Sequence, residues 1–277
     1  YRTGLVVTEI ESDIKHLKFG ALVSSIKRWT RGAKSRKIKS GQSIKKGTEV
    51  VPNYFSTDRI AIYTAVFGSY DNVPEPYCKP DNCDFYLFTD QKQNNAKSAW
   101  IVKEIPEGLE KMTNAEKNRY IKMHPDKLFD DYKYSIYIDG NVQVISDLTE
   151  YVHLIGATGI GIHQHDARNC VYQELEVIKQ TGRETPENIE RHKKYLQSTG
   201  MPENYGLLQC NVIVREHHNP VCISIMKDWW KEFCEYTKRD QISLPHVLYM
   251  HHILIDEIGV LGTNVYKNPS FRILNHR

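Results

Sequence analysis

Short runs of apolar and β-branched residues recur along the chain, and such runs are typical of buried strands. The expected strands are Ile60–Phe67, Asp84–Asp90, Trp100–Val102, Tyr134–Ile138, Gly159–His163 and Leu207–Arg215. Helical spacing of apolar residues predicts helices at about Asn114–Leu128 and Pro220–Tyr236, and a further helix that starts near Ser243 and Pro245. Because strands alternate with helices, we expect an α/β domain with a mostly parallel central sheet flanked by helices.

The N-terminal part of the chain follows a different pattern. Residues 5–31 have an apolar stripe at helical spacing, and a stretch rich in Lys, Ser and Gly follows to about Thr48. Lys and Arg far outnumber acidic residues here. We therefore predict a basic helical extension and linker at 1–57 and a single domain at 58–277. The extension is interpreted as a solvated arm, a docking segment for an upstream domain, or a contact with an anionic membrane surface.

Composition and charge narrow the possible functions. The chain has 277 residues, of which 40% are hydrophobic and 26% charged, as in an ordinary globular protein. Its net charge of +3 gives no electrostatic reason to expect nucleic acid binding. The six cysteines lie mostly in apolar patterns and are interpreted as free, with a local Cys78–Cys83 disulfide as the alternative. These features favour a cytoplasmic location, peripheral to a membrane if the extension binds one.

Candidate chemistry begins where the predicted strands end. Thr64, Asp90 and Asp139 lie at or near carboxyl ends of strands, where α/β sheets bind ligands. The segment Tyr137–Asn141 places an acid, a glycine and an amide directly after a strand. Oxygen ligands of this kind suit a hard divalent cation that bridges two phosphates, and Gly140 allows the backbone to approach them. A simple Asp-Gly-Asn turn is the alternative interpretation.

Several segments, taken in order, resemble a glycosyltransferase family first catalogued as domain of unknown function 616. They are Tyr63–Asp71, Phe88–Asp90, His124–Phe129, Tyr137–Asn141, His163–Glu174 and Arg239–Pro245, within about residues 59–250. The resemblance implies a GT-A fold like that of glycosyltransferase family 8, in which an Asp-x-Asp motif and a late histidine bind the metal. It implies Asp139, Asn141 and His276 as ligands of Mn²⁺ or Mg²⁺. Asn141 stands where the second acid of the motif is expected.

Donor-binding residues are expected on the first strand and on the helix near residue 114. Thr64, Ala65, Tyr70 and Asp90 are the candidates near the first two strands, and Lys117, Arg119 and Lys122 are the candidates for the donor diphosphate. These three cations cannot all share one helix face, but a pair of them can. Arg suits bidentate contacts to phosphate. A solvated helix face is the alternative.

Sugar- and acceptor-binding candidates lie further along the chain. Gln209 and Asn211 are two apart on a predicted strand, so both amides are expected to point the same way, toward sugar hydroxyls or toward core partners. A polar cluster formed by His163, His165, Arg168 and Glu174 is interpreted as sugar- or acceptor-binding rather than as a zinc site.

The resemblance also places Asp240 and Gln241 at the donor sugar and acceptor. Asp240 is our candidate catalytic carboxylate, as a base or as a group that orients the sugar. Since acidic residues favour helix N-termini, capping of the next helix is the alternative.

The sequence therefore predicts a metal-dependent, hexosyl-type glycosyltransferase with a nucleoside diphosphate donor, UDP favoured, and a glycan or other hydroxyl acceptor. Surface polysaccharide or glycoconjugate synthesis is the expected setting, and the family 8 resemblance favours retention of configuration. A nucleotidyltransferase is one alternative, although Gly68-Ser69-Tyr70 is poor in glycine for a phosphate loop. A non-catalytic carbohydrate-binding protein on a degenerate GT-A fold is the other.

Overall fold

The computed structural model describes residues 55–92 and 96–276. These residues all belong to one compact unit. The predicted basic extension at 1–57 lies outside the described residues except for its last three, so the boundary near residue 58 stays a prediction. Among the described residues, no helix has the length and apolar content that crossing a bilayer requires.

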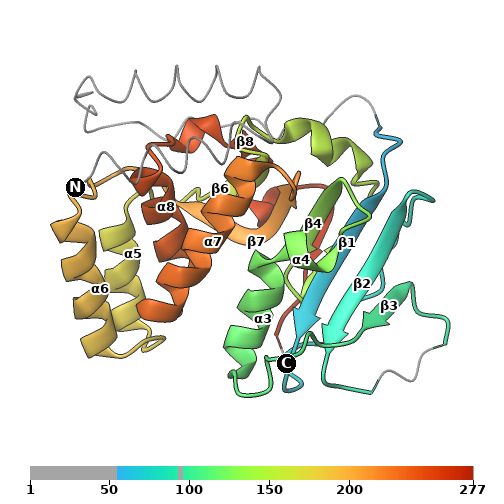
Figure 1. Cartoon of the computed structure of the whole chain (residues 1–277), viewed down its shortest axis with the longest axis horizontal. Helices are drawn as coiled ribbons and strands as arrows, with labels where there is room; N and C mark the ends of the chain where they lie inside the picture. The colour runs from blue at the N-terminus through green and yellow to red at the C-terminus, as the bar shows by residue number, and fades with distance from the viewer. Residues whose placement is uncertain (1–54, 93–95, 277) are drawn as a thin grey trace, which may run out of the picture. The chain divides into compact units, whose positions relative to one another are not determined.

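A mixed sheet forms the centre of the described domain (Figure 1). Its strands are β1 (Ile60–Val66), β2 (Cys83–Thr89), β3 (Trp100–Lys103), β4 (Tyr134–Ile138), β6 (Ile160–Gln164), β7 (Leu208–Arg215) and β8 (Gly259–Val260). Their spatial order is β3-β2-β1-β4-β7-β6-β8. Strands β1 to β4 run parallel, whereas β7 is antiparallel to its neighbours β4 and β6. The predicted α/β class with a mostly parallel sheet is confirmed.

Helices cover one face of the sheet. They are α3 (Asn114–Met123), α4 (Pro125–Leu128), α5 (Val171–Gln180), α6 (Pro186–Ser198), α7 (Pro220–Glu235) and α8 (Asp240–Met250). Helix α3 packs on β1 and α7, and α8 packs on α7, α5 and β7. The core between them contains alternate sheet residues, such as Tyr63, Tyr137 and Ile213, together with Trp229 and Phe233 of α7. This alternation follows from the two-residue period of a strand.

Shorter elements cover the opposite face of the sheet. They are an antiparallel pair, β5 (Val142–Val144) with β9 (Phe271–Ile273), and the 3-10 helices η1 (Thr149–Leu154) and η3 (Val265–Lys267), while η2 (Ile255–Glu257) precedes β8. Ile62, Ile136 and Val212 of the sheet pack there with Val144 and Phe271. Because β5 follows β4 directly, its pairing with β9 returns the end of the chain to the segment after Asp139.

Two predicted helices differ from the observed ones. The helix expected at 114–128 is divided, because His124 precedes proline and adopts φ −123° and ψ 47°. Residues before proline avoid the helical region. The predicted start near Ser243 and Pro245 was wrong, since α8 begins at Asp240 and Pro245 lies inside it. Proline is most common in the first turn of a helix, and this preference suggested the later start.

All six cysteines are free, including Cys78 and Cys83, so the alternative of a local disulfide is not observed.

Candidate active site

Asp139 leaves β4 at the edge of the sheet where β1 and β2 also end. Its backbone N–H donates to the carbonyl oxygen of Asn211, at 2.8 Å. The side-chain amide of Asn211 donates to Asp139 Oδ2, at 2.9 Å. Asn211 belongs to β7, one residue beyond the last β4–β7 pair, Ile138 with Val212. Asn211 of β7 therefore holds the carboxylate of Asp139 in place, while 27% of the Asp139 side chain stays exposed.

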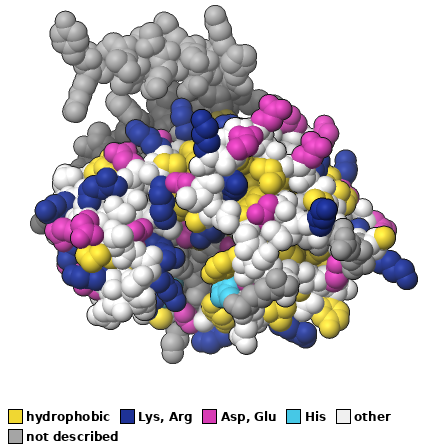
Figure 2. Space-filling view, turned by 90° about the horizontal axis from the view of Figure 1, so that it is seen from below, with side chains coloured by type: hydrophobic (Ala, Val, Ile, Leu, Met, Phe, Trp, Pro, Cys, Tyr) yellow, Lys and Arg dark blue, Asp and Glu magenta, His cyan; other side chains and the backbone are white. Residues whose placement is uncertain are grey.

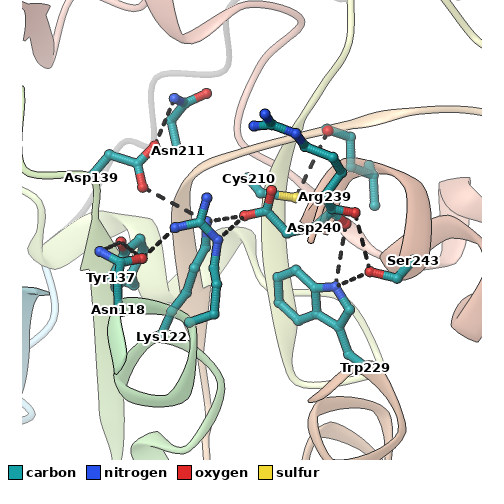
Figure 3. A network of polar contacts seen from close by, with 12 residues as sticks. Asn118, Lys122, Tyr137, Asp139, Cys210, Asn211, Trp229, Arg239, Asp240 and Ser243 are labelled. Atoms are coloured by element: carbon teal, nitrogen blue, oxygen red, sulfur yellow. Dashed lines mark hydrogen bonds and ion pairs between the residues drawn. The ribbon is translucent and has the colours of Figure 1, made fainter. Parts of the chain in front are cut away.

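Charged side chains from α3 and α8 meet beside Asp139, which follows β4 (Figure 3). Lys122 Nζ lies 2.6 Å from Asp240 Oδ2 and 3.7 Å from Asp139 Oδ1. Arg119 Nε lies 3.1 Å from Asp240 Oδ2. Since Arg119 and Lys122 are three residues apart on a helix, they can reach the same partner. We call Arg119, Lys122, Asp139 and Asp240 the site network.

Lys122 is the buried centre of this network. Its side chain is 1% exposed, and its ammonium group also lies 4.9 Å from the ring centre of Tyr137. The structure therefore uses Lys122 to join two carboxylates. Lys122 is therefore less accessible to a diphosphate than the other two predicted cations, Lys117 and Arg119, which are half-buried.

Asp240 is the first residue of α8, but its carboxylate does not cap that helix. Arg239 occupies the N-cap position and forms no side-chain cap hydrogen bond. Trp229 Nε1 donates to the carbonyl oxygen of Asp240, at 3.3 Å, and to Ser243 Oγ, at 3.1 Å. Burial alone would raise the pKa of Asp240, but the two cations of α3 lower it. Asp240 is thus held as an anion, by cations that α3 supplies.

Helix α3 is fixed at both ends, so its cations are held in place. A capping box starts the helix. The side-chain amide of Asn118 donates to the carbonyl oxygen of Ala65 on β1, at 2.6 Å. At the other end, the buried Arg215 of β7 donates to the carbonyl oxygen of Lys122, at 2.7 Å. These contacts align α3 with the edge of the sheet that carries Asp139.

The end of the chain reaches the motif that follows β4. Asn141 exchanges two hydrogen bonds with the backbone of Leu274, both 2.9 Å long. Two residues further on, His276 Nδ1 lies 2.9 Å from Asp71 Oδ1. A Cβ atom added to Gly140 would stand 2.4 Å from the Val66 side chain of β1. A larger residue would therefore clash at this close approach.

Asp71 was not among the candidates predicted from the sequence. Its side chain is 7% exposed, and its Oδ2 lies 3.5 Å from the position of a Cβ added to Gly140. Asp71 and His276 are 205 positions apart, so only the fold brings them together. The available signal was its place next to the predicted donor residue Tyr70.

The side chains around Gly140 have the chemistry of ligands for a divalent cation. Asp139, Asn141 and His276 offer carboxylate, amide and imidazole donors, and Asp71 adds a second carboxylate. Among residues 55–92 and 96–276, no three His, Cys, Asp or Glu side chains are grouped so that they could hold a metal by themselves. Ions such as Mg²⁺ are often held by one or two carboxylates together with substrate phosphates. The donor set therefore fits a cation that arrives with a nucleotide.

The predicted donor residues in and near β1 and β2 divide into buried and exposed ones. Thr64 and Ala65 lie inside β1 and are 0% and 1% exposed. Tyr70 is 65% exposed, and its ring centre lies 5.3 Å from that of His276. Tyr70 is thus the predicted donor residue of this group whose ring lies open to solvent beside His276.

Asp90 orders the turn that follows β1. Each of its carboxylate oxygens accepts the backbone N–H of Gly68, at 3.0 Å. Gly68 adopts φ +66°, which glycine tolerates best. Burial alone would raise the pKa of Asp90, but hydrogen bonds from Gln91 and Gly68 and the charge of Lys117 lower it.

Two of the predicted sugar-binding residues are bound within the core. Gln209 Oε1 accepts the backbone N–H of Val265, at 2.8 Å. His163 Nε2 lies 3.0 Å from the side-chain amide nitrogen of Asn268, and burial lowers the pKa of His163 to about 3. Because the partners Val265 and Asn268 are themselves buried, both side chains are turned into the core, so the structure argues against this predicted role.

A register shift explains why Gln209 and Asn211 have different surroundings. Strand β6 pairs Ile162 with Ile213 and the next residue, His163, with Gln209. Three residues of β7, 210 to 212, therefore lie between pairs that are consecutive on β6. The regular alternation assumed from the sequence does not hold across such an irregularity.

The other members of the predicted polar cluster lie together after β6. Arg168 Nε contacts Glu174 Oε2 at 2.5 Å. His165 Nδ1 accepts the backbone N–H groups of Ala167, at 3.2 Å, and Arg168, at 3.1 Å, so this nitrogen carries no hydrogen. Burial lowers the pKa of His165. His165, Arg168 and Glu174 thus remain candidates for contact with a sugar or an acceptor.

The chain belongs to the TOD1/MUCI70 family of glycosyltransferase-like domains, whose family model matches residues 29–274. The predicted membership of a glycosyltransferase family is confirmed. Among curated proteins, the chain is similar to the probable hexosyltransferase MUCI70 of Arabidopsis thaliana, with 25% identity over 217 residues. The match covers 68% of this chain and spans 37% of that relative.

Two solved glycosyltransferase structures are also similar to the chain. The apo bifunctional glycosyltransferase WbbM has a TM-score of 0.40 at 13% identity, covering 73% of this chain and 39% of that one. The galactosyltransferase LgtC, in complex with donor and acceptor sugar analogues, has a TM-score of 0.40 at 15% identity, covering 68% of this chain and 70% of that one.

Proposed function

We propose that this chain transfers a sugar from a nucleoside diphosphate donor to a hydroxyl acceptor at the edge where β1, β2 and β4 end. One observation carries the proposal. Asp139 and Asp240, which are far apart in the sequence, share the buried ammonium group of Lys122. Membership of a glycosyltransferase-like family supports it. Figure 2 shows the molecule from below, the side toward which β1 and β2 point in Figure 1, where Lys and Arg side chains are interspersed with Asp, Glu and apolar ones.

A divalent cation, Mn²⁺ or Mg²⁺, would offset the charge that develops on the leaving diphosphate. Asp139, Asn141 and His276 would hold it. Asp71 would accept the Nδ1–H of His276 and so keep the other ring nitrogen of that histidine available. Arg119 is well suited to contact diphosphate oxygens, because its guanidinium group offers several donors in one plane.

Asp240 would orient the donor sugar or accept the proton of the acceptor hydroxyl. Its neighbouring cations keep it ionised, as either role requires. Gln241, the next residue of α8, would add an amide beside the sugar. We further propose a hexosyl donor on UDP and retention of configuration. Surface polysaccharide or glycoconjugate synthesis, at a cytoplasmic site, is the proposed setting.

A panel of nucleotide-sugars, scored by thermal shift with and without Mn²⁺, tests this proposal. A ligand that binds the folded state at 100 times its Kd stabilises that state by about 2.7 kcal/mol. We expect a UDP-hexose to raise the Tm more with Mn²⁺ than without it. Stabilisation by free sugars but by no nucleotide would instead favour a carbohydrate-binding protein. Release of pyrophosphate from a nucleoside triphosphate would favour a nucleotidyltransferase.

A further inference from the structure

A second polar cluster joins α6, α7 and α8 and has no part in the proposed chemistry. Glu232 Oε1 lies 3.1 Å from His192 Nε2, and Glu232 Oε2 lies 2.6 Å from His246 Nδ1. The other nitrogen of each ring lies near a hydroxyl group. His192 Nδ1 is 2.8 Å from the Thr237 hydroxyl oxygen, and His246 Nε2 is 2.9 Å from the Thr199 hydroxyl oxygen. We call these five residues the helix junction.

All of the helix junction except the half-buried Thr199 is buried, which limits the charges that it can hold. His192, His246 and Thr237 are 0% exposed, and Glu232 is 6% exposed. A buried carboxylate is costly unless a positive charge lies beside it. In the described part of the chain, the ion-pair contacts of Glu232 are with these two histidines. One of the two histidines should therefore be protonated.

The hydrogen bonds of Thr199 favour His246 over His192 as the ring with a hydrogen on both nitrogens. The Thr199 hydroxyl has one hydrogen, and it lies 2.8 Å from the carbonyl oxygen of Leu196. If it donates there, it must accept a hydrogen from His246 Nε2. An ionised Glu232 can only accept, so His246 Nδ1 donates as well. His192 needs no second hydrogen, because the Thr237 hydroxyl is available to donate to its Nδ1.

The helix junction also lies next to the contacts that hold Asp240. Glu232 is three residues beyond Trp229 on α7, and His246 is three residues beyond Ser243 on α8. Trp229 donates to Ser243 Oγ and to the backbone of Asp240. Two residues one turn apart on α7 therefore hold two residues one turn apart on α8.

We propose that Glu232 and a protonated His246 form a buried ion pair that positions α8, and with it Asp240. Both are positioning residues, because neither touches the site network. The assignment of charge stands on the hydrogen bonds and on the cost of burying the Glu232 carboxylate without a positive charge beside it. Its consequence for turnover rests on the proposed function.

NMR of the full chain labelled with ¹⁵N-histidine tests the charge at neutral pH. The variant His246→Gln assigns the signals of that ring. We expect hydrogens on both ring nitrogens of His246 and on one ring nitrogen of His192. A nitrogen without hydrogen in the ring of His246 would overturn the ion pair, whatever the activity of the protein.

Kinetics of Glu232→Gln test the positioning role. The amide keeps the volume of the side chain but not its charge. Since small displacements of a catalytic group can cost about 10²-fold in rate, we expect kcat to fall about 10- to 100-fold. The donor KM should change by less than about threefold, because the diphosphate contacts lie elsewhere. The ring of His246 should also lose its second N–H signal.

His217→Gln is the matched control for a general loss of stability. His217 is likewise buried, and its Nε2 lies 3.0 Å from the carbonyl oxygen of Phe129, away from the helix junction. It should lower the Tm but leave kcat unchanged. If Glu232→Gln does not fold, Thr199→Val removes the acceptor of His246 and should lower kcat in the same way.

The possible failures can be told apart. Wild-type kcat in the folded Glu232→Gln or Thr199→Val variant would overturn the positioning role while leaving the proposed function intact. A wild-type protein that transfers no sugar would instead overturn the proposed function, and the positioning role with it. The charge assignment would then still be decided by NMR.

Discussion

The site network and the helix junction are built from similar side chains. They differ in how many of their polar groups have a partner inside the protein. In both, a carboxylate lies between two nitrogen-bearing side chains. The helix junction is closed, since each ring nitrogen and each oxygen of Glu232 has a partner inside the protein. In the site network, Asp139 and Arg119 keep 27% and 25% of their side chains exposed. A closed cluster specifies packing, whereas a partly open one can exchange partners with a ligand.

Among the variants that test this difference, Asp240→Asn should have the largest effect on turnover. The amide keeps the shape but removes the charge that faces the α3 cations, so we expect turnover to fall about 10²- to 10⁴-fold. Affinity for the donor should stay nearly unchanged, because the diphosphate contacts remain. Steady-state kinetics and calorimetry separate the two effects. Asp228→Asn, which alters a half-exposed carboxylate bound to His251, is the matched control. Wild-type turnover in Asp240→Asn would remove this residue from the catalytic site.

Lys122→Met should mainly affect stability. It leaves Asp240 buried with one cation fewer, and breaking a buried pair costs about 3–5 kcal/mol. The lowered pKa of Asp240 contributes stability above its unfolded pKa of about 3.9, and this stability is lost as pH falls through the folded pKa. The deficit of the variant should therefore be largest at neutral pH and shrink below about pH 4.

Urea unfolding at pH 7 and at pH 3.5 measures this difference. Lys127→Met, at an exposed position of α4, is the control and should change stability by less than about 0.5 kcal/mol. A deficit in Lys122→Met that does not depend on pH would show that Asp240 is not held by this lysine.

Asp71→Ala tests the cation end of the site. If Asp71 orients His276, its loss should weaken Mn²⁺ binding about 10- to 100-fold, as is usual for the partner of a ligating histidine. Asp71→Asn keeps an acceptor for the Nδ1–H and should lose less. Electron paramagnetic resonance titrations with UDP present measure this affinity, with Asp256→Ala, at an exposed position of η2, as control. Equal Mn²⁺ affinity in Asp71→Ala and wild type would reject the role of Asp71.

The sequence identified the parts of the site that depend on local pattern. Apolar runs gave β1, β2, β4 and β7, and so placed Asp139 at the end of a strand. Contacts between residues that are far apart in the sequence could not be predicted from it. The pairing of β5 with β9, which brings His276 to Asp71, has no periodic signal of its own, because each strand has only three residues. Asp71 was missed for this reason.

Gln209 shows a second limit of sequence reasoning. Strand periodicity correctly gave β7, but periodicity assumes regular pairing. The shift between Ile162 and His163 depends on how two strands meet and not on the composition of either. The same limit applies to His163, whose burial is set by segments near residues 268 and 271.

His163→Gln should have the smallest effect on activity, with kcat within about twofold of wild type, because His163 lies in the core. Its effect should appear in the pH dependence of stability. With a folded pKa of about 3 and an unfolded pKa of about 6.5, the unfolded state takes up a proton that the folded state does not. Wild-type stability should thus fall by about 1.4 kcal/mol per pH unit from this group below pH 6.5. A slope in His163→Gln equal to that of wild type would contradict this account.

The most direct measurement of the central claim is a calorimetric titration of UDP into wild type and Asp139→Ala, each with and without Mn²⁺. If the acid after β4 holds the cation of the donor diphosphate, Mn²⁺ will tighten UDP binding to the wild type and leave binding to the variant weak. UDP affinity that is the same in both proteins, with the same response to Mn²⁺, would contradict that assignment.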